Sequence, residues 1–114
     1  MKIILDTNAI LYSIKYKIDL FTELERICHF PYTICIIDKT LEELKDKSAL
    51  QLLKKKNVTL IKTSSSESVD NLILEYADKD TIVITQDKAL KKKLKEKNIK
   101  LIVIRQKKYL QNVL

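Results

Sequence analysis

The chain has 114 residues, but it contains no glycine, a single proline (Pro31) and a single histidine (His29). Without glycine, neither a glycine-rich phosphate-binding loop nor the glycine fingerprint of dinucleotide-binding domains is possible. One histidine excludes a histidine triad or a histidine-rich zinc site within one chain. Tight turns must therefore be formed by asparagine, aspartate, serine and lysine.

Cysteine is also scarce, and Cys28 and Cys35 are the only two. Cys35 lies inside a predicted strand and is interpreted as a small buried hydrophobic residue. Nothing indicates a disulfide framework or a Cys/His metal site. No apolar run approaches membrane-spanning length, and the run after Lys2 ends at Asp6, unlike a signal peptide. We therefore expect a cytoplasmic protein with no membrane partner.

The composition is otherwise that of a globular domain, with 46% apolar and 32% charged residues. The length predicts one domain that spans residues 1–114. Lysine and arginine number 22 against 15 acids, which gives a net charge of +7. This excess indicates either a polyanionic partner or a lysine-rich solvated surface, and the charge alone does not choose between them.

Short apolar runs rich in β-branched residues alternate with helical patterns along the chain. The predicted strands are Ile3–Leu5, Thr33–Ile37, Val58–Ile61, Thr81–Thr85 and Lys100–Ile104. Continuous apolar runs of this length are typical of strands buried on both faces, and therefore parallel. The alternation predicts an α/β fold with a central parallel sheet and right-handed crossovers.

Helices are predicted between the strands. The first spans Ala9–Lys15, and the second is capped by Asp19. A third begins near Asp38 and continues or kinks as far as Asn57. A capping box at Ser64–Glu67 precedes an apolar stripe from Val69 to Ala77. Asp87 can cap the last helix, and the basic tail from Arg105 to Leu114 is expected to be irregular or to end in a short helix.

Acidic residues follow several of the predicted strands. Alone, each has a structural explanation: Asp6 and Asp87 can cap helices, Asp70 can complement a helix dipole, and Glu42 and Glu43 can form a polar helix face. Together they gather at one edge, because parallel strands end there and the following helices begin there. Crowded carboxylates repel one another, and hard Mg²⁺ or Mn²⁺ relieves this repulsion. Metal-activated water suits attack on a phosphodiester.

Four motifs resemble, in order, those of PIN-domain nucleases. They are Leu5-Asp6-Thr7-Asn8, Leu41-Glu42-Glu43-Leu44, the D-x-x-I-x-x-x-A pattern from Asp70 to Ala77, and Val83-Ile84-Thr85-Gln86-Asp87. The match covers nearly the whole chain. The chain is similar to small archaeal PIN proteins, to VapC-type toxins and to PIN nucleases of ribosomal RNA processing.

The resemblance implies a three-layer α/β/α sandwich whose five-stranded parallel sheet has the order 3-2-1-4-5. It also implies a hydrolase, a Mg²⁺- or Mn²⁺-dependent endoribonuclease. The implied metal-holding and catalytic residues are Asp6, Glu43, Asp70 and Asp87. The family glutamate usually precedes a leucine, which indicates Glu43, but helix geometry leaves Glu42 open. Residues expected to orient the carboxylates are Thr7, Asn8, Asp38 and Thr85, although Asp38 is alternatively only a helix cap.

Basic residues near this edge are candidates for holding the RNA backbone. They are Lys88, Lys91, Lys92, Arg105, Lys107 and Lys108, and Tyr109 offers a stacking surface. The alternative for each is a solvated surface position. The resemblance leaves open a toxin restrained by a protein antitoxin or an RNA-processing factor, and it implies a homodimer. Two other classes are weighed: a non-catalytic RNA-binding or scaffold PIN domain and, last, a receiver-like domain with Asp6 as phosphate acceptor.

Overall fold

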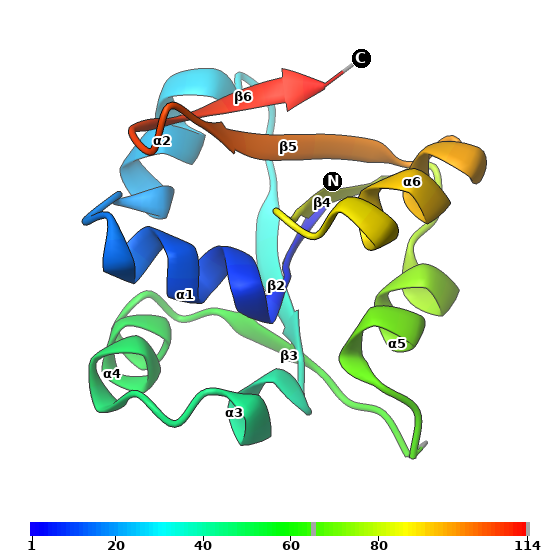
Figure 1. Ribbon diagram of the computed structural model, residues 1–114, viewed down its shortest axis with the longest axis horizontal. Coiled ribbons are helices and arrows are strands. Elements are labelled where there is room, and N and C mark those ends of the chain that lie inside the picture. Colours follow the sequence, from blue (N-terminus) through cyan, green and yellow to red (C-terminus); the bar gives the residue numbers. More distant parts are fainter. Residues whose placement is uncertain (65, 114) are drawn as a thin grey trace.

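Six strands form one central sheet in the computed structural model, which describes residues 1–64 and 66–113 (Figure 1). They are β1 (Lys2–Leu5), β2 (Thr33–Ile37), β3 (Thr59–Ile61), β4 (Thr81–Ile84), β5 (Lys100–Arg105) and β6 (Tyr109–Val113). Their order is β3-β2-β1-β4-β5-β6, and β1 to β5 run parallel. The predicted α/β fold and the strand order 3-2-1-4-5 are confirmed.

Helices cover both faces of this sheet (Figure 1). They are α1 (Thr7–Lys15), α2 (Leu20–Ile27), α3 (Thr40–Glu43), α4 (Lys47–Lys55), α5 (Val69–Tyr76) and α6 (Lys88–Glu96). Along β1, Ile3 and Leu5 pack into the core beneath α1, α2 and α4, whereas Ile4 packs into the core beneath α5 and α6. All three side chains are fully buried, as expected for a strand between two helical layers.

The absence of glycine is visible at the ends of three helices. Lys17, Asn57 and Asn98 follow α1, α4 and α6 with φ values of 56°, 53° and 60°. After α1, the Lys17 N–H donates to the Ile14 carbonyl and the Ile18 N–H donates to the Ser13 carbonyl. This is the Schellman pattern, in which glycine usually occupies the left-handed position. As predicted, lysine and asparagine form turns that glycine forms elsewhere.

The tail is the main correction to the expected fold. Instead of an irregular segment or a short helix, β6 pairs antiparallel with β5, from Arg105 opposite Tyr109 to Leu101 opposite Val113. Gln106 and Lys107 adopt positive φ in the connecting turn. Leu110 is buried in the core, which anchors the strand.

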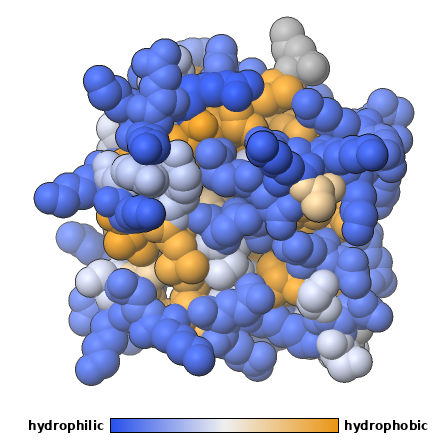
Figure 2. Space-filling model, in the orientation of Figure 1, coloured by the Kyte–Doolittle hydropathy of each residue, from blue (hydrophilic) through white to orange (hydrophobic). Residues whose placement is uncertain are grey.

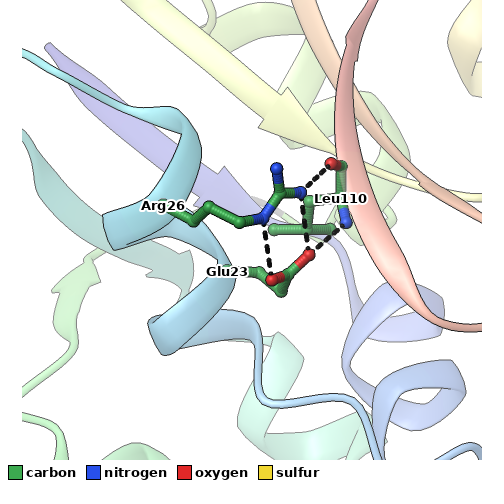
Figure 3. Close-up of polar contacts among 3 residues, drawn as sticks. All are labelled: Glu23, Arg26 and Leu110. Atoms are coloured by element: carbon green, nitrogen blue, oxygen red, sulfur yellow. Dashed lines mark hydrogen bonds and ion pairs between the residues drawn. The ribbon is translucent and has the colours of Figure 1, made fainter.

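The outer edge of β6 is held by α2 (Figure 3). The Arg26 Nη2 donates to the Leu110 carbonyl at 2.9 Å, and the Leu110 N–H donates to Glu23 Oε1 at 2.9 Å. Arg26 also pairs with Glu23 at 3.0 Å. Solvent screens an exposed pair of this kind, so its charges add little to stability. Its structural role is to satisfy backbone groups that an edge strand would otherwise leave open.

Two helix predictions also need correction. The segment from Asp38 to Asn57 forms two separate helices, because the chain breaks after α3 and Asp46 caps α4 by accepting hydrogen bonds from the N–H groups of Ser48 and Ala49. The predicted capping box includes Ser65, which lies outside the described residues. The observed cap of α5 is Ser68, whose hydroxyl accepts from the Asn71 N–H.

Two further expectations concern cysteine and membranes. Cys28 and Cys35 are free thiols buried in the core, and burial raises the pKa of both. In the part of the chain that the structure describes, none of the helices combines the length and apolar character needed to cross a membrane.

Candidate functional site

Asp6 lies where β1 ends and α1 begins. Its carboxylate accepts a hydrogen bond from the Thr7 N–H at 2.9 Å, and it is the N-cap of α1. The second carboxylate oxygen accepts from the Thr85 hydroxyl at 2.8 Å, which ties the end of β1 to the end of β4. Only 2% of Asp6 is exposed. Asp6 can therefore be both the cap of α1 and an acid of a functional site.

The electrostatic environment of Asp6 is unfavourable for its charge. Burial raises the pKa of Asp6 to about 6, and the hydrogen bond from Thr85 is the largest opposing influence. The negative charges of Asp70 and Asp87 raise it further. An acid with a pKa this far above its usual value, near other acids, is typical of a functional site.

Glu43 lies at the end of the short helix α3, across from α1. The Thr7 hydroxyl donates to Glu43 Oε1 at 2.5 Å. Both glutamates are exposed, but the charge of Glu43 raises the pKa of Asp70. Of the two glutamates that sequence reasoning left open, Glu43 is the one that the geometry connects to the other acids.

Asp70 and Asp87 begin two helices on the other face of the sheet. Asp70 is the second residue of α5 and is partly buried. Burial, followed by the charges of Asp87 and Glu43, raises the pKa of Asp70, and Lys93 opposes this shift. Asp87 caps α6, because its Oδ1 accepts from the Leu90 N–H at 3.0 Å.

The structure thus brings the four predicted acids to one edge of the sheet, and we call them the acid group. Its members are Asp6, Glu43, Asp70 and Asp87. Asp70 interacts electrostatically with each of the other three. Within residues 1–64 and 66–113, no three acid, histidine or cysteine side chains are already close enough to enclose a metal ion. The four described acids therefore share an edge and influence one another's charge, but they do not form a closed set of ligands.

Three polar residues form hydrogen bonds that connect the backbone segments around the acid group. Thr85 donates to Asp6 and accepts from the Asp87 N–H at 3.1 Å, so one buried hydroxyl links two of the acids. The Asn8 side-chain oxygen accepts from the Gln86 N–H at 3.3 Å. The Gln86 side chain in turn bonds both backbone groups of Ile104. Sequence reasoning missed this role of Gln86, whose only signal was its position between Thr85 and Asp87.

Asp38 takes no part in these hydrogen bonds. Its carboxylate accepts hydrogen bonds from the N–H groups of Lys39 and Thr63 and from the Thr63 hydroxyl. The bond from the Thr63 N–H is the main cause that lowers the pKa of Asp38. These contacts tie the end of β2 to the segment after β3. The structure connects Asp38 to the loop framework and not to the acid group.

The predicted basic residues separate into two sets. Lys88, Lys91 and Lys95 recur at helical spacing on α6, and the charges of Arg105, Lys95 and Lys88 all act on Lys91. Burial, then Arg105, Lys95 and Lys88, lower the pKa of Lys91, whereas Asp87 raises it. Sequence reasoning did not single out Lys95.

The remaining basic residues point elsewhere. The Lys107 ammonium lies 5.0 Å from the centre of the Tyr16 ring, a cation–π contact that holds the β5–β6 turn against α1. Lys92 and Lys108 are exposed side chains on the surface. Among the six predicted residues, Lys88, Lys91 and Arg105 are the ones that lie together beside an acid of the group.

Comparison with known proteins identifies relatives of this chain in sequence and in fold. Residues 3–107 match the family described as "PIN like domain". The chain is 39% identical to Ribonuclease VapC4 of Methanocaldococcus jannaschii, and the match covers 96% of this chain and 95% of that protein. The structure of the PIN domain endonuclease Utp24 superposes with a TM-score of 0.85 and 26% identity, over 97% of this chain and 90% of that one. The chain therefore belongs to the PIN-like domain family of nucleases.

Proposed function

We propose that this protein is a divalent-metal-dependent endoribonuclease that hydrolyses RNA phosphodiester bonds at the acid group. The observation that carries the proposal is the buried Asp6, held by two hydrogen bonds while its charge is opposed by Asp70 and Asp87. At position 6 the protein keeps an acid whose charged form is disfavoured by burial and by neighbouring charges. A residue that only caps a helix does not need to carry such a charge. The relatives named as a ribonuclease and an endonuclease support the same activity.

The residues fit a hard divalent cation. The acid group offers carboxylate oxygens, the ligands that Mg²⁺ and Mn²⁺ prefer, and both cysteine thiols are buried in the core. The residues that would hold the cation are Asp6, Glu43, Asp70 and Asp87. When bound, the cation supplies Lewis acidity toward the phosphate and lowers the pKa of water.

The surrounding residues fix the orientation of these acids. The Thr85 hydroxyl and the Thr7 N–H hold both oxygens of Asp6, and the Thr7 hydroxyl holds one oxygen of Glu43. Replacing a residue that hydrogen-bonds to a metal ligand commonly lowers metal affinity or activity by about 10–100-fold. Lys88, Lys91 and Arg105 lie beside Asp87, where cationic side chains can hold the phosphates that flank the cleaved bond.

A toxin-type role is favoured over ribosomal RNA processing. The relative that is 39% identical over 96% of this chain is named as a VapC ribonuclease. A VapC-type toxin requires a protein antitoxin as partner, and a homodimer remains a prediction. A small gene directly upstream that encodes a co-purifying inhibitor would support this role.

The direct test is cleavage of a mixed RNA pool with Mn²⁺, Mg²⁺ or EDTA, by the wild type and by Asp6→Asn purified in parallel. We expect cleavage by the wild type only when a metal is present and none by the variant. Cleavage that persists in EDTA would refute the metal dependence. RNA binding without cleavage under any condition would indicate a non-catalytic RNA-binding domain instead.

A further inference from the structure

A row of cations leads away from the acid group along α6. Lys88, Lys91 and Lys95 lie on one side of the helix, and Arg105 at the end of β5 lies near Lys91. In the described parts of the chain, no salt bridge neutralises these four side chains. Four cations held together in this way repel one another, and a polyanion that binds them relieves this repulsion.

An open cavity of about 800 Å³ lies at the far end of this row. It opens where α6 passes into β5 and where β6 ends, at the opposite edge of the sheet from the acid group. On the face drawn in Figure 2, apolar surface lies near β5 and β6 and is bordered by hydrophilic side chains. Lys95 lines the cavity and also belongs to the cation row, so the two features are continuous.

The lining of the cavity suits a nucleobase. Phe30, an aromatic side chain that is 39% exposed, offers a ring face for stacking. Asn98 and Asn112 add amides that can pair with base edges, and Lys95 and Lys100 add ammonium groups for phosphates. The described residues that line the cavity include no acid. Aromatic stacking combined with cations is the usual way to bind single-stranded RNA.

The distance between the acid group and the cavity also fits a short RNA strand. Asp87 and Lys95 are eight residues apart on α6, which corresponds to about 12 Å at ~1.5 Å per residue. A stacked strand spans this distance with roughly three to four nucleotides at ~3.4 Å each. An RNA backbone that follows the cation row from the acid group therefore reaches the cavity within a few nucleotides.

We propose that this cavity is a distal nucleotide-binding subsite, which takes an unstacked base of the same RNA strand that crosses the acid group. This inference rests on the proposed ribonuclease function and adds to it a source of sequence preference. The base stacks on Phe30, the amides of Asn98 and Asn112 contact its edge, and Lys95 and Lys100 hold the adjacent phosphates.

The test is the affinity of fluorescently labelled single-stranded RNA, measured by anisotropy in EDTA so that no cleavage occurs. Randomised pools of dinucleotides and octanucleotides include every base at each position. We expect Phe30→Ala to weaken octanucleotide binding by about 5- to 100-fold, the range for loss of one stacked base, and to leave dinucleotide binding unchanged. Tyr76→Ala is the matched control, because Tyr76 is an aromatic residue with 45% exposure on α5.

Asn112→Ala provides a second test that preserves the aromatic ring, and thermal melting verifies that each variant is folded. It should weaken octanucleotide binding as well. The subsite would be refuted if Phe30→Ala and Asn112→Ala bind both pools like the wild type, or if Tyr76→Ala loses as much affinity. Failure of the wild type to bind any RNA in EDTA would refute the subsite, whereas the proposed function is judged separately by cleavage in Mn²⁺.

Discussion

Among the residues that the structure describes, four aspartates cap helices, and they occupy two different regions. Asp6 and Asp87 cap α1 and α6 at the acid group, whereas Asp19 and Asp46 cap α2 and α4 away from it. All four accept hydrogen bonds from backbone N–H groups of their helices. The local geometry of a cap therefore does not separate a structural aspartate from a functional one.

The two regions differ in their electrostatics. Hydrogen bonds from the Thr22 N–H and hydroxyl are the main causes that lower the pKa of Asp19, an exposed cap whose charge stabilises the fold. Burial instead raises the pKa of Asp6 to about 6, with neighbouring acids adding to the shift. Capping explains Asp19 completely. For Asp6 it leaves an energetic cost unexplained, which the cation proposed for the acid group would offset.

The strongest test of this comparison replaces one cap in each region. We expect Asp87→Asn to reduce RNA cleavage by more than about 100-fold, beyond the ~10–100-fold range of residues that only orient metal ligands. Asp46→Asn should cleave like the wild type, because asparagine caps a helix as well as aspartate. Initial cleavage rates in Mn²⁺ measure both. Equal rates for the two variants would remove the functional distinction between the regions.

The second test uses the pH dependence of stability. The pKa of Asp6 is raised from 3.8 to about 6 on folding, so its ionisation destabilises the fold as pH rises from about 4 to about 6. The full penalty, roughly 3 kcal/mol at ~1.4 kcal/mol per unit, persists at pH 7. Asp6→Asn should therefore gain more stability over the wild type at pH 7 than at pH 4, measured by urea unfolding in EDTA.

Asp19→Asn is the control for this measurement, and its pH dependence should have the opposite sign. The pKa of Asp19 is lowered on folding, so its charge stabilises the fold above its unfolded pKa, and this contribution is lost in acid. Any stability lost by Asp19→Asn should appear at pH 7 and vanish at low pH. A gain from Asp6→Asn that is the same at both pH values would show that its charge is not disfavoured.

The third test concerns the neighbouring glutamates of α3. Glu43→Gln should reduce cleavage, because Glu43 lies beside Asp70 and accepts from Thr7, whereas Glu42→Gln should leave it unchanged. Thr7→Val removes only the hydroxyl that holds Glu43 and should reduce activity by about 10–100-fold. Cleavage rates of the three variants side by side measure this. Full activity of Glu43→Gln would exclude Glu43 from the site.

The smallest expected effect is on the unfolding free energy, and it concerns the residues that follow the carboxyl ends of α1 and α4. The left-handed positions after α1 and α4 are held by Lys17 and Asn57. A left-handed conformation costs a residue such as lysine about 1–2 kcal/mol, and asparagine less, because its side chain bonds locally. Lys17→Gly should therefore raise the unfolding free energy by up to about 1 kcal/mol, and Asn57→Gly by less. A loss of cleavage in Lys17→Gly would contradict a purely structural role there.

Much of this arrangement could be predicted from the sequence, because apolar runs fix the buried strands and a parallel sheet brings their ends together. Asp6 and Asp87 were found in this way. The strand β6 was not, because its formation depends on a turn with positive φ at Gln106 and Lys107 and on contacts from α2. The choice between Glu42 and Glu43 depends on one hydroxyl of α1, which no pattern within α3 can reveal.

The central claim is that the acid group is a divalent-metal site whose repulsion the cation relieves. Thermal melting with and without Mn²⁺ tests it most directly, because a ligand that binds only the native state raises the melting temperature. We predict a clear rise for the wild type, the same rise for Asp46→Asn and a much smaller one for Asp6→Asn. An equal rise in Asp6→Asn, or no rise in the wild type at millimolar Mn²⁺, would contradict the account.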